Sequence, residues 1–327
     1  LKFNYTKRFT RQDYKRPATL TSSLYSDMAR QGWPVLPLYD PNGYYYDAPS
    51  PALGLAEGGV DKTQTDNTYH QIGLAIEPIK NWVTHIDFNY RIQSANRHWD
   101  SQMRYNHDVN GNPYVYSNSS NVHEDYYKEN YYNFNAYTEY THTFNEIHNL
   151  HVMGGFQAEN LKQTQFGLQR NGIMFPDKPE VDLTTGLDYY GNEVTPSTNG
   201  SRNEWATAGF FARVNYDYQG KYLVEANVRA DGTSRFRKGN QWKTFPSVSV
   251  GWNIARESFF EPINDLIGTL KLRASYGSLG NQNTTNWYQT FQTMTVGSSD
   301  GTWLMNGKKP NTATAPGLVS TTLTWET

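Results

Sequence analysis

The sequence has 327 residues, a formal net charge of -2, 37% hydrophobic residues and a mean hydropathy of -0.77. No apolar run approaches the roughly 18 residues that a membrane-spanning helix needs, and no basic cluster favours a nucleic-acid partner. The absence of cysteine excludes disulfides, thiolate metal sites and cysteine nucleophiles.

Taken in chain order, segments that alternate apolar with polar residues predict about ten β-strands. The chain opens at Leu1 inside such a segment and ends in strand-like sequence, without an initiator Met or a signal peptide, so it is expected to be part of a longer protein. The expected strands are 1–10, 69–79, 82–97, 126–144, 149–170, 204–218, 221–236, 244–256, 269–278 and one starting near 321.

The alternation is clearest between Ala206 and Asp231. Both strands there carry apolar residues on one face and polar or charged residues on the other. A soluble sandwich would pack the apolar face on a second sheet, whereas a membrane barrel would turn it to lipid and its polar face to a lumen. Aromatic residues make up 15% of the chain, which favours the barrel because its interfacial girdles are aromatic. The polar residues expected to face the lumen are Arg91, Arg213, Glu225, Arg229 and Asp231.

The connections between the expected strands alternate in length. Short turns are expected at 80–81, 145–148 and 219–220, and a short amphipathic helix within 257–268. Long polar loops are expected near 11–68, 98–125, 171–203 and 279–320, and only the 237–243 loop breaks this rule. The long loops therefore emerge at one end of the sheet, as in outer-membrane barrels with long extracellular loops.

The hairpin at Gly220 permits a prediction of register. A three-residue loop 218–220 that ends on a left-handed glycine would place Asp217 opposite Lys221. The same count places Arg213 opposite Glu225 on the polar face, and Tyr216 opposite Tyr222 on the apolar face.

The aromatic residues of the long loops are candidates for the extracellular contact surface, where they could stack on sugar rings or contact another protein. Each could instead simply pack one loop against another. The candidates are Tyr44, Tyr45, Tyr46, Trp99, Tyr114 and Tyr116.

No motif predicts catalysis, a metal site or a cofactor. The eight histidines lack a close ligand spacing, and the segment from Asp108 to Asn112 resembles a turn more than a calcium loop because no closing Glu follows. Carboxylates such as Asp217 and Glu225 have basic residues on the same face, which favours ion pairing over glycosidase chemistry. The sequence therefore predicts a protein that is not an enzyme.

A series of short motifs runs from Asn215 to Thr327, and its residues are expected to be structural. They include Asp231, Gly232, Ser234, Arg235, Phe236, Phe245, Pro246, Ser247, Gly251, Trp252, Gly280, Asn281 and Gln282. In order and spacing these motifs resemble the barrel signature of the SusC/RagA family of TonB-dependent outer-membrane transporters. Leu323 to Glu326 resembles the start of the next strand in that signature.

This resemblance implies an all-β, transmembrane antiparallel barrel of about 22 strands, of which residues 1–327 would supply about ten. It further implies TonB-dependent import of oligosaccharides, or of peptides in the RagA branch, under a SusD-like surface lipoprotein in the outer membrane of a Gram-negative bacterium of the Bacteroides type. The internal plug and the TonB-contacting segment would lie outside this chain. A soluble glycan-binding β-sandwich and a passive porin or adhesin barrel are the alternatives.

Overall fold

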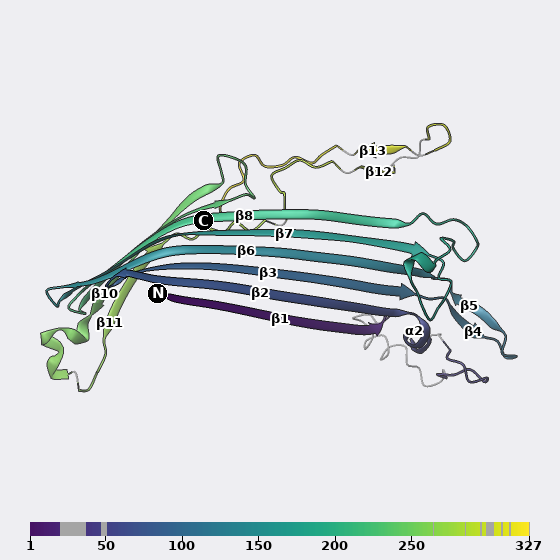
Figure 1. Cartoon of the computed structure of the whole chain (residues 1–327), viewed down its shortest axis with the longest axis horizontal. Helices are drawn as coiled ribbons and strands as arrows, with labels where there is room; N and C mark the ends of the chain where they lie inside the picture. Colours follow the sequence, from purple (N-terminus) through teal and green to yellow (C-terminus); the bar gives the residue numbers. More distant parts are fainter. Residues whose placement is uncertain are drawn as a thin grey trace.

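The computed structural model describes residues 1–19, 37–46, 51–263, 265–284, 286–294, 296–298, 304–308, 310–313 and 315–326. Nine strands form one antiparallel sheet in the order β1-β2-β3-β6-β7-β8-β9-β10-β11, a single curved layer rather than the two layers of a sandwich (Figure 1). Its strands are β1 (Lys2–Pro17), β2 (Val60–Ile79), β3 (Trp82–Ser101), β6 (Asn121–Phe144), β7 (His148–Asn171), β8 (Ser197–Tyr218), β9 (Tyr222–Thr233), β10 (Trp242–Asn253) and β11 (Lys271–Gly277).

Nine of the ten predicted strands are confirmed, and β1, β2, β3, β6 and β8 extend well beyond the predicted bounds at the end that carries the long loops. The extensions were missed because both of their faces are polar, so no alternation marks them. Cross-strand pairs such as Arg11 with Asp66, whose Nε and Oδ1 atoms lie 2.7 Å apart, continue the sheet there. The strand expected near 321 is wrong: Glu326 makes only an isolated bridge with Asn281.

Short turns and long loops lie at opposite ends of the sheet, as predicted (Figure 1). Within the long loops the structure adds the helix α2 (Ala52–Glu57), the strand pair β4 (Arg104–His107) and β5 (Pro113–Ser117), and the 3-10 turn η1 (Val181–Leu183). A further strand pair, β12 (Val296–Ser298) and β13 (Asn311–Ala313), lies within the last long loop. The loops are therefore shorter and more structured than the sequence indicated.

Away from these polar extensions, the strands present a polar face and an apolar face. Antiparallel pairing places Arg91, Arg213, Glu225, Arg229 and Asp231 on the same side of the sheet, which we call the polar face. The opposite side, the apolar face, carries partly exposed aliphatic and aromatic side chains. They include Phe210, Val214, Val224, Val228, Val248 and Val250.

Aromatic side chains mark two levels of the apolar face. At the short-turn end Trp82 contacts Tyr140 with ring centroids 6.1 Å apart. Eight residues further along β3, Tyr90 stacks on Tyr132 at 4.6 Å and lies 6.2 Å from His70. At about 3.3 Å per residue the two levels lie roughly 26 Å apart along the strand. Because barrel strands tilt by about 35 to 45°, this span corresponds to a height of roughly 20 Å, comparable with the apolar band of a membrane barrel, which is about 25 Å tall and flanked by aromatic residues.

The register predicted for the β8–β9 hairpin is wrong by two residues on β9. Tyr218 pairs with Tyr222, Arg213 with Asn227 rather than Glu225, Tyr216 with Val224, and Asp217 with Leu223. The turn begins one residue later than expected because Gln219 and Gly220 both adopt positive φ angles, 55° and 67°, as in the primed turns that match strand twist. Lys221 thus belongs to the turn, and its amide N donates to the carbonyl O of Tyr218 at 2.9 Å.

The helix predicted within 257–268 is also wrong in type and bounds. Two 3-10 turns, η2 (Ile254–Arg256) and η3 (Ser258–Ile263), follow β10, and Pro262 lies inside the second. Proline lacks the N–H that an α-helix would require in its interior. Among the described residues, no helix is long and apolar enough to cross a membrane.

One compact apolar cluster lies at the loop end of β9 and β10. It joins Phe236, Phe245 and Trp325, which are 2%, 7% and 7% exposed. The Trp325 ring meets Phe245 edge-on at 5.4 Å. The segment around Trp325 therefore packs against the sheet and covers the loop ends of β9 and β10.

Candidate functional site

Four of the five polar residues predicted to face a lumen line one hollow on the polar face. Arg213, Glu225, Arg229 and Asp231 border this space of 780 Å³, which is also lined by residues of β10, of β11 and of the segment that follows β11. Arg91 lies elsewhere on the same face, where it forms an ion pair with Glu129 and lies 5.3 Å from the centre of the Tyr131 ring.

Arg213 and Glu225, two of the charged residues of the hollow, are joined through a neutral amide. Arg213 Nε donates to Asn227 Oδ1 at 2.6 Å, and Asn227 Nδ2 donates to Glu225 Oε1 at 2.8 Å. Asn227 thus links the two residues that the predicted register had placed opposite each other. Both still lie on the polar face, because a shift of two residues preserves the side of the sheet.

Arg229 and Asp231 form a directly bonded pair of charges in the same hollow, nearer the loop end of β9. Arg229 Nε donates to both carboxylate oxygens of Asp231, at 2.8 and 2.9 Å, and its Nη2 donates to Gln157 Oε1 at 3.1 Å. Gly209 makes room for this pair, since a Cβ there would come within 2.2 Å of Asp231 Oδ1. The hollow can therefore both donate and accept hydrogen bonds, which suits a polar ligand without net charge.

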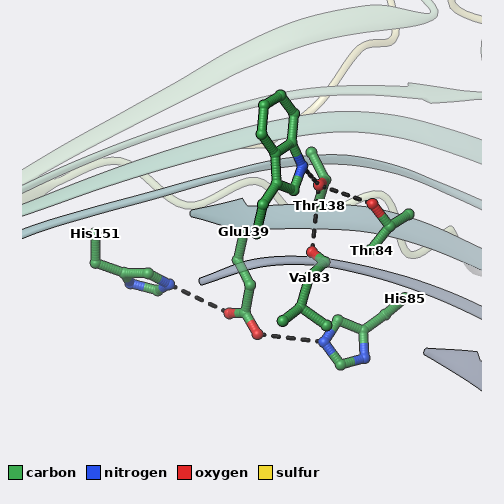
Figure 2. Close-up of polar contacts among 7 residues, drawn as sticks. Val83, Thr84, His85, Thr138, Glu139 and His151 are labelled. Carbon is green, nitrogen blue, oxygen red and sulfur yellow. Dashed lines mark hydrogen bonds and ion pairs between the residues drawn. The ribbon is translucent and has the colours of Figure 1, made fainter. Parts of the chain in front are cut away.

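Sequence reasoning missed a histidine–carboxylate chain nearer the short-turn end. Figure 2 shows Glu139 between two imidazoles: Oε1 lies 3.2 Å from His85 Nε2, and Oε2 lies 3.2 Å from His151 Nε2. The three residues come from β3, β6 and β7. The same strands carry Thr84 and Thr138 on the apolar face, where their hydroxyls lie 3.0 Å apart. Only the register, which the sequence does not give, brings such residues together.

Trp99 lies on the polar face at the loop end of β3. It stacks on His123 with ring centroids 3.5 Å apart and planes 9° from parallel. Arg97 lies 5.4 Å from the Trp99 ring centre and donates to Asp61 at 2.9 Å. This aromatic platform is held in place from two sides.

The loop tyrosines form a separate group around the β4–β5 hairpin. Tyr44 stacks on His107 at 3.8 Å, whereas Tyr45 stacks on Tyr39 at 4.9 Å. A hollow of 420 Å³ is bordered by Tyr46, Tyr114, Asp40 and His107, among others, and Tyr116 lies under the Arg104 guanidinium at 5.5 Å. Five of the six predicted aromatic residues are thus loop residues that pack within this region, and Trp99 forms its own platform.

The segment at Asp108 is a turn, as predicted, and the same arrangement recurs at Asp188 and Asp40. Asp108 Oδ1 accepts from the amides of Asn110 and Asn112, at 2.8 and 2.9 Å. Asp188 and Asp40 make the same two contacts with the residues two and four positions later. Hydrogen bonds from the Asn112 side chain and backbone hold the pKa of Asp108 below its usual range. The ionised Asp108 carboxylate therefore stabilises the turn at pH values above the ordinary pKa of Asp. This stabilisation is lost as the pH falls through the lowered pKa of the folded protein.

The arginine of the signature is held between two tryptophans. The Arg235 guanidinium lies 5.4 Å from the Trp205 ring centre and 5.9 Å from that of Trp287. Its Nη1 donates to Thr284 Oγ1 at 3.0 Å. Burial lowers the pKa of Arg235.

Two signature glycines leave room for aromatic rings. A Cβ on Gly280 would lie 2.1 Å from the Phe245 ring, and one on Gly232 would lie 2.5 Å from Trp242. Gly251 shows no such constraint, because its nearest neighbour would be 3.4 Å away.

The remaining signature residues make local polar contacts. Ala206 N donates to Ser234 Oγ at 2.9 Å, and Ser247 Oγ accepts from Asn227 at 3.3 Å. Pro246 O accepts from Ser278 N at 3.1 Å. Further along, Trp252 Nε1 donates to Glu257 at 3.1 Å and Asn281 Nδ2 to Glu326 at 3.2 Å. Gln282 lies beside the Arg229–Asp231 pair, in a hollow that Trp325 also borders.

Comparison with known proteins places these features in a family. The family described as "TonB dependent receptor-like, beta-barrel" matches residues 3–327. The TonB-dependent receptor P39 of Formosa agariphila is 32% identical over 226 residues, which cover 68% of this chain and 20% of that protein. The TonB-dependent receptor SusC of Bacteroides thetaiotaomicron is 26% identical over 300 residues, which cover 86% of this chain and 29% of SusC.

Solved structures show the same fold. The RagAB peptide transporter superposes with a TM-score of 0.67 at 19% identity, over 87% of this chain and 30% of that chain. The "open-open" state of the RagAB peptide importer covers 99% of this chain and 35% of its own, with a TM-score of 0.66 at 18% identity. This chain thus spans less than a third of the two curated relatives named above.

Proposed function

Since the chain belongs to the TonB-dependent receptor β-barrel family, we propose that the complete protein is a SusC-type importer that takes up oligosaccharides across the outer membrane of a Gram-negative bacterium. In this proposal residues 1–327 form part of the barrel wall. TonB would supply the energy through parts of the protein outside this chain, and a SusD-like surface lipoprotein would close over the long loops. The chain performs no chemistry on its cargo.

The two-faced sheet is the observation that carries the transport proposal. The apolar face offers lipid a band of aliphatic side chains between two levels of aromatic residues. The polar face lines the import path with charges that are already paired, such as Arg229 with Asp231. Paired charges present hydrogen-bonding groups without attracting ions of one sign, which suits neutral, hydroxyl-rich cargo.

The Trp99 platform supports an oligosaccharide as the cargo. Flat sugar faces stack on aromatic rings, and the Trp99–His123 stack places two such rings on the polar face at the loop end, where cargo would enter. The loop group around Tyr46 and Tyr114 provides a second aromatic surface for cargo or lid.

A peptide is the second candidate cargo. The fold shared with the RagAB peptide transporter favours it. So does the coexistence of Arg213 and Glu225 in one hollow, since such groups could bind the two termini or the charged side chains of a peptide.

Calorimetric titration of the complete protein with its lipoprotein lid distinguishes the two candidates. Oligosaccharides should bind and mixed peptides should not, and Trp99→Ala should weaken binding by about tenfold, as expected for an aromatic anchor. Trp242→Ala, on the apolar face, is the matched control and should bind as the wild type does. Binding of peptides alone would establish the second candidate, and binding of neither class would exclude both.

The proposed orientation is tested on intact cells. Epitope tags inserted at Asn118 and Asn199, near the loop end, should be accessible to antibody, and a tag at Gly220, in a short turn, should not. Labelling of the Gly220 tag on unbroken cells would contradict the orientation.

A further inference from the structure

Three side chains with metal-binding atoms meet on the outside of the loop end. His98 comes from β3, Glu124 from β6, and Glu180 from the loop between β7 and β8, just before η1. One ligand atom of each lies within 4.8 Å of the other two. No other group of three His, Cys, Asp or Glu side chains in the described ranges meets this condition.

The backbone that carries these residues is fixed by hydrogen bonds. His98 and Glu124 are direct cross-strand partners, and His98 Nδ1 lies 2.5 Å from Glu124 Oε1. On the loop side, the Leu183 amide donates to the Glu180 carbonyl at 3.0 Å. The loop itself is tied back by the Gly172 amide, which donates to the Ser120 carbonyl at 2.8 Å. The three side chains are therefore presented by ordered elements, as a binding site requires.

The charges of the group are unbalanced. Two carboxylates close to each other repel, and one imidazolium can neutralise only one of them. A divalent cation would neutralise both and use the histidine nitrogen as a third ligand. The position suits an aqueous ion, because His98 lies eight residues, roughly 26 Å at about 3.3 Å per residue, beyond the Tyr90 level of the apolar face.

We propose that His98, Glu124 and Glu180 form a binding site for a divalent transition-metal ion of the zinc class. One imidazole nitrogen and two carboxylates match the three protein ligands with which zinc leaves a fourth position for water. Calcium and magnesium are disfavoured, because they prefer oxygen ligands alone. Zinc ligands lie about 2.0 to 2.2 Å from the metal, so the site closes by small rotations of the two glutamate side chains, of which Glu180 is exposed.

The bound ion would fasten the loop between β7 and β8 to the middle of the sheet. Such a clamp differs from the transport function proposed above, since it concerns the order of one extracellular loop and not the cargo. The bound ion would hold η1 against β6, and these two elements are already in contact. They lie at the surface where a lid would be seated.

Zinc binding to the purified complete protein tests the proposal without cargo or lid. After treatment with a chelator, the wild type should bind one more zinc ion than Glu180→Gln or His98→Gln, or bind it at least 10- to 100-fold more tightly, roughly the loss that even outer-shell changes produce. Glu193→Gln, an exposed carboxylate of the same loop, and His142→Gln, near the short-turn end, should match the wild type. Calcium and magnesium should not compete.

Hydrogen exchange provides the structural readout. Zinc should slow exchange of the amides from Val181 to Thr184 in the wild type and in both control variants, but not in Glu180→Gln. Equal zinc binding by the wild type and both site variants, or unchanged exchange in this segment, would overturn the proposal. Neither result bears on import, which is measured separately.

Discussion

The tall strands β1, β2, β3, β6, β7 and β8 end differently from the short strands β9, β10 and β11 of the same sheet. β6 and β7 have 24 residues each, whereas β9 and β10 have 12. At about 3.3 Å per residue these lengths correspond to roughly 80 and 40 Å along the strand. An apolar band about 25 Å tall therefore occupies only part of the tall strands but most of the short ones.

Above the band the tall strands are joined by polar pairs rather than by a core. Lys162 pairs with Glu204 at 3.1 Å, and Asp61 accepts from both Arg16 and Arg97. The short strands end instead beneath the cluster of Phe236, Phe245 and Trp325. Backbone ladders with polar cross-strand pairs thus suffice to extend a strand into water, whereas a strand that stops early needs apolar cover from the returning chain.

The largest expected effect comes from removing that cover. Trp325→Ala deletes a side chain that is 7% exposed and should reduce the free energy of unfolding by about 3 to 5 kcal/mol, the usual cost of a buried aromatic truncation. Leu318→Ala removes a fully exposed side chain and is the control. Denaturant unfolding of the complete protein in detergent measures both, and equal midpoints would show that the cluster does not stabilise the short half.

The apolar face of the short half gives the next largest effect. Val224→Arg places a charge toward lipid and should cost about 2 to 4 kcal/mol near the bilayer midplane. Asn227→Arg, three residues away on the polar face, should be mild. Assembly into heat-resistant barrel is the measurement. Equal tolerance of the two changes would contradict the assignment of faces.

In the tall half, Asp61 should matter more than the exposed pairs around it. Its side chain is 3% exposed and accepts three part-buried hydrogen bonds from two arginines. Asp61→Ala should therefore cost roughly 1 to 3 kcal/mol, because hydrogen bonds from charged groups lose their acceptor. Asp66→Ala breaks a more exposed pair with Arg11 and should cost less than about 1 kcal/mol. The unfolding midpoints of the two variants test this order. A larger loss of stability in Asp66→Ala than in Asp61→Ala would mean that burial does not determine how much these ion pairs stabilise the protein.

The sequence predicts more of the short half than of the tall half, for a physical reason. Alternation shows a strand only where one face is apolar, so the largely polar extension of β2 from Val60 to Thr68 remained hidden. The signature residues were visible as motifs, but the close approach of Gly280 to the Phe245 ring depends on the path of a long loop. Likewise, His98, Glu124 and Glu180 meet only once the register and loop path are known. The alternation of residues along each strand is enough to predict that Arg213 and Glu225 share one face of the sheet, and the strand pairing places both on the polar face.

The smallest effect concerns the register of the β8–β9 hairpin, where a pair such as Arg213 with Asn227 contributes only about 0.2 to 1 kcal/mol. Geometry tests it better than stability does. Directly opposite residues have Cβ atoms about 4.5 to 5.5 Å apart and diagonal ones about 7 to 8 Å, whereas a disulfide requires about 3.5 to 4.5 Å.

In the complete protein, with any other cysteines replaced, Arg213→Cys combined with Asn227→Cys should therefore oxidise readily, because a small strand movement suffices. Arg213→Cys combined with Glu225→Cys should stay reduced under the same conditions. Faster oxidation of the second pair would restore the register in which the turn closes at Asp217 and Lys221. It would also mean that the positive φ angles of Gln219 and Gly220 do not determine where this hairpin turns.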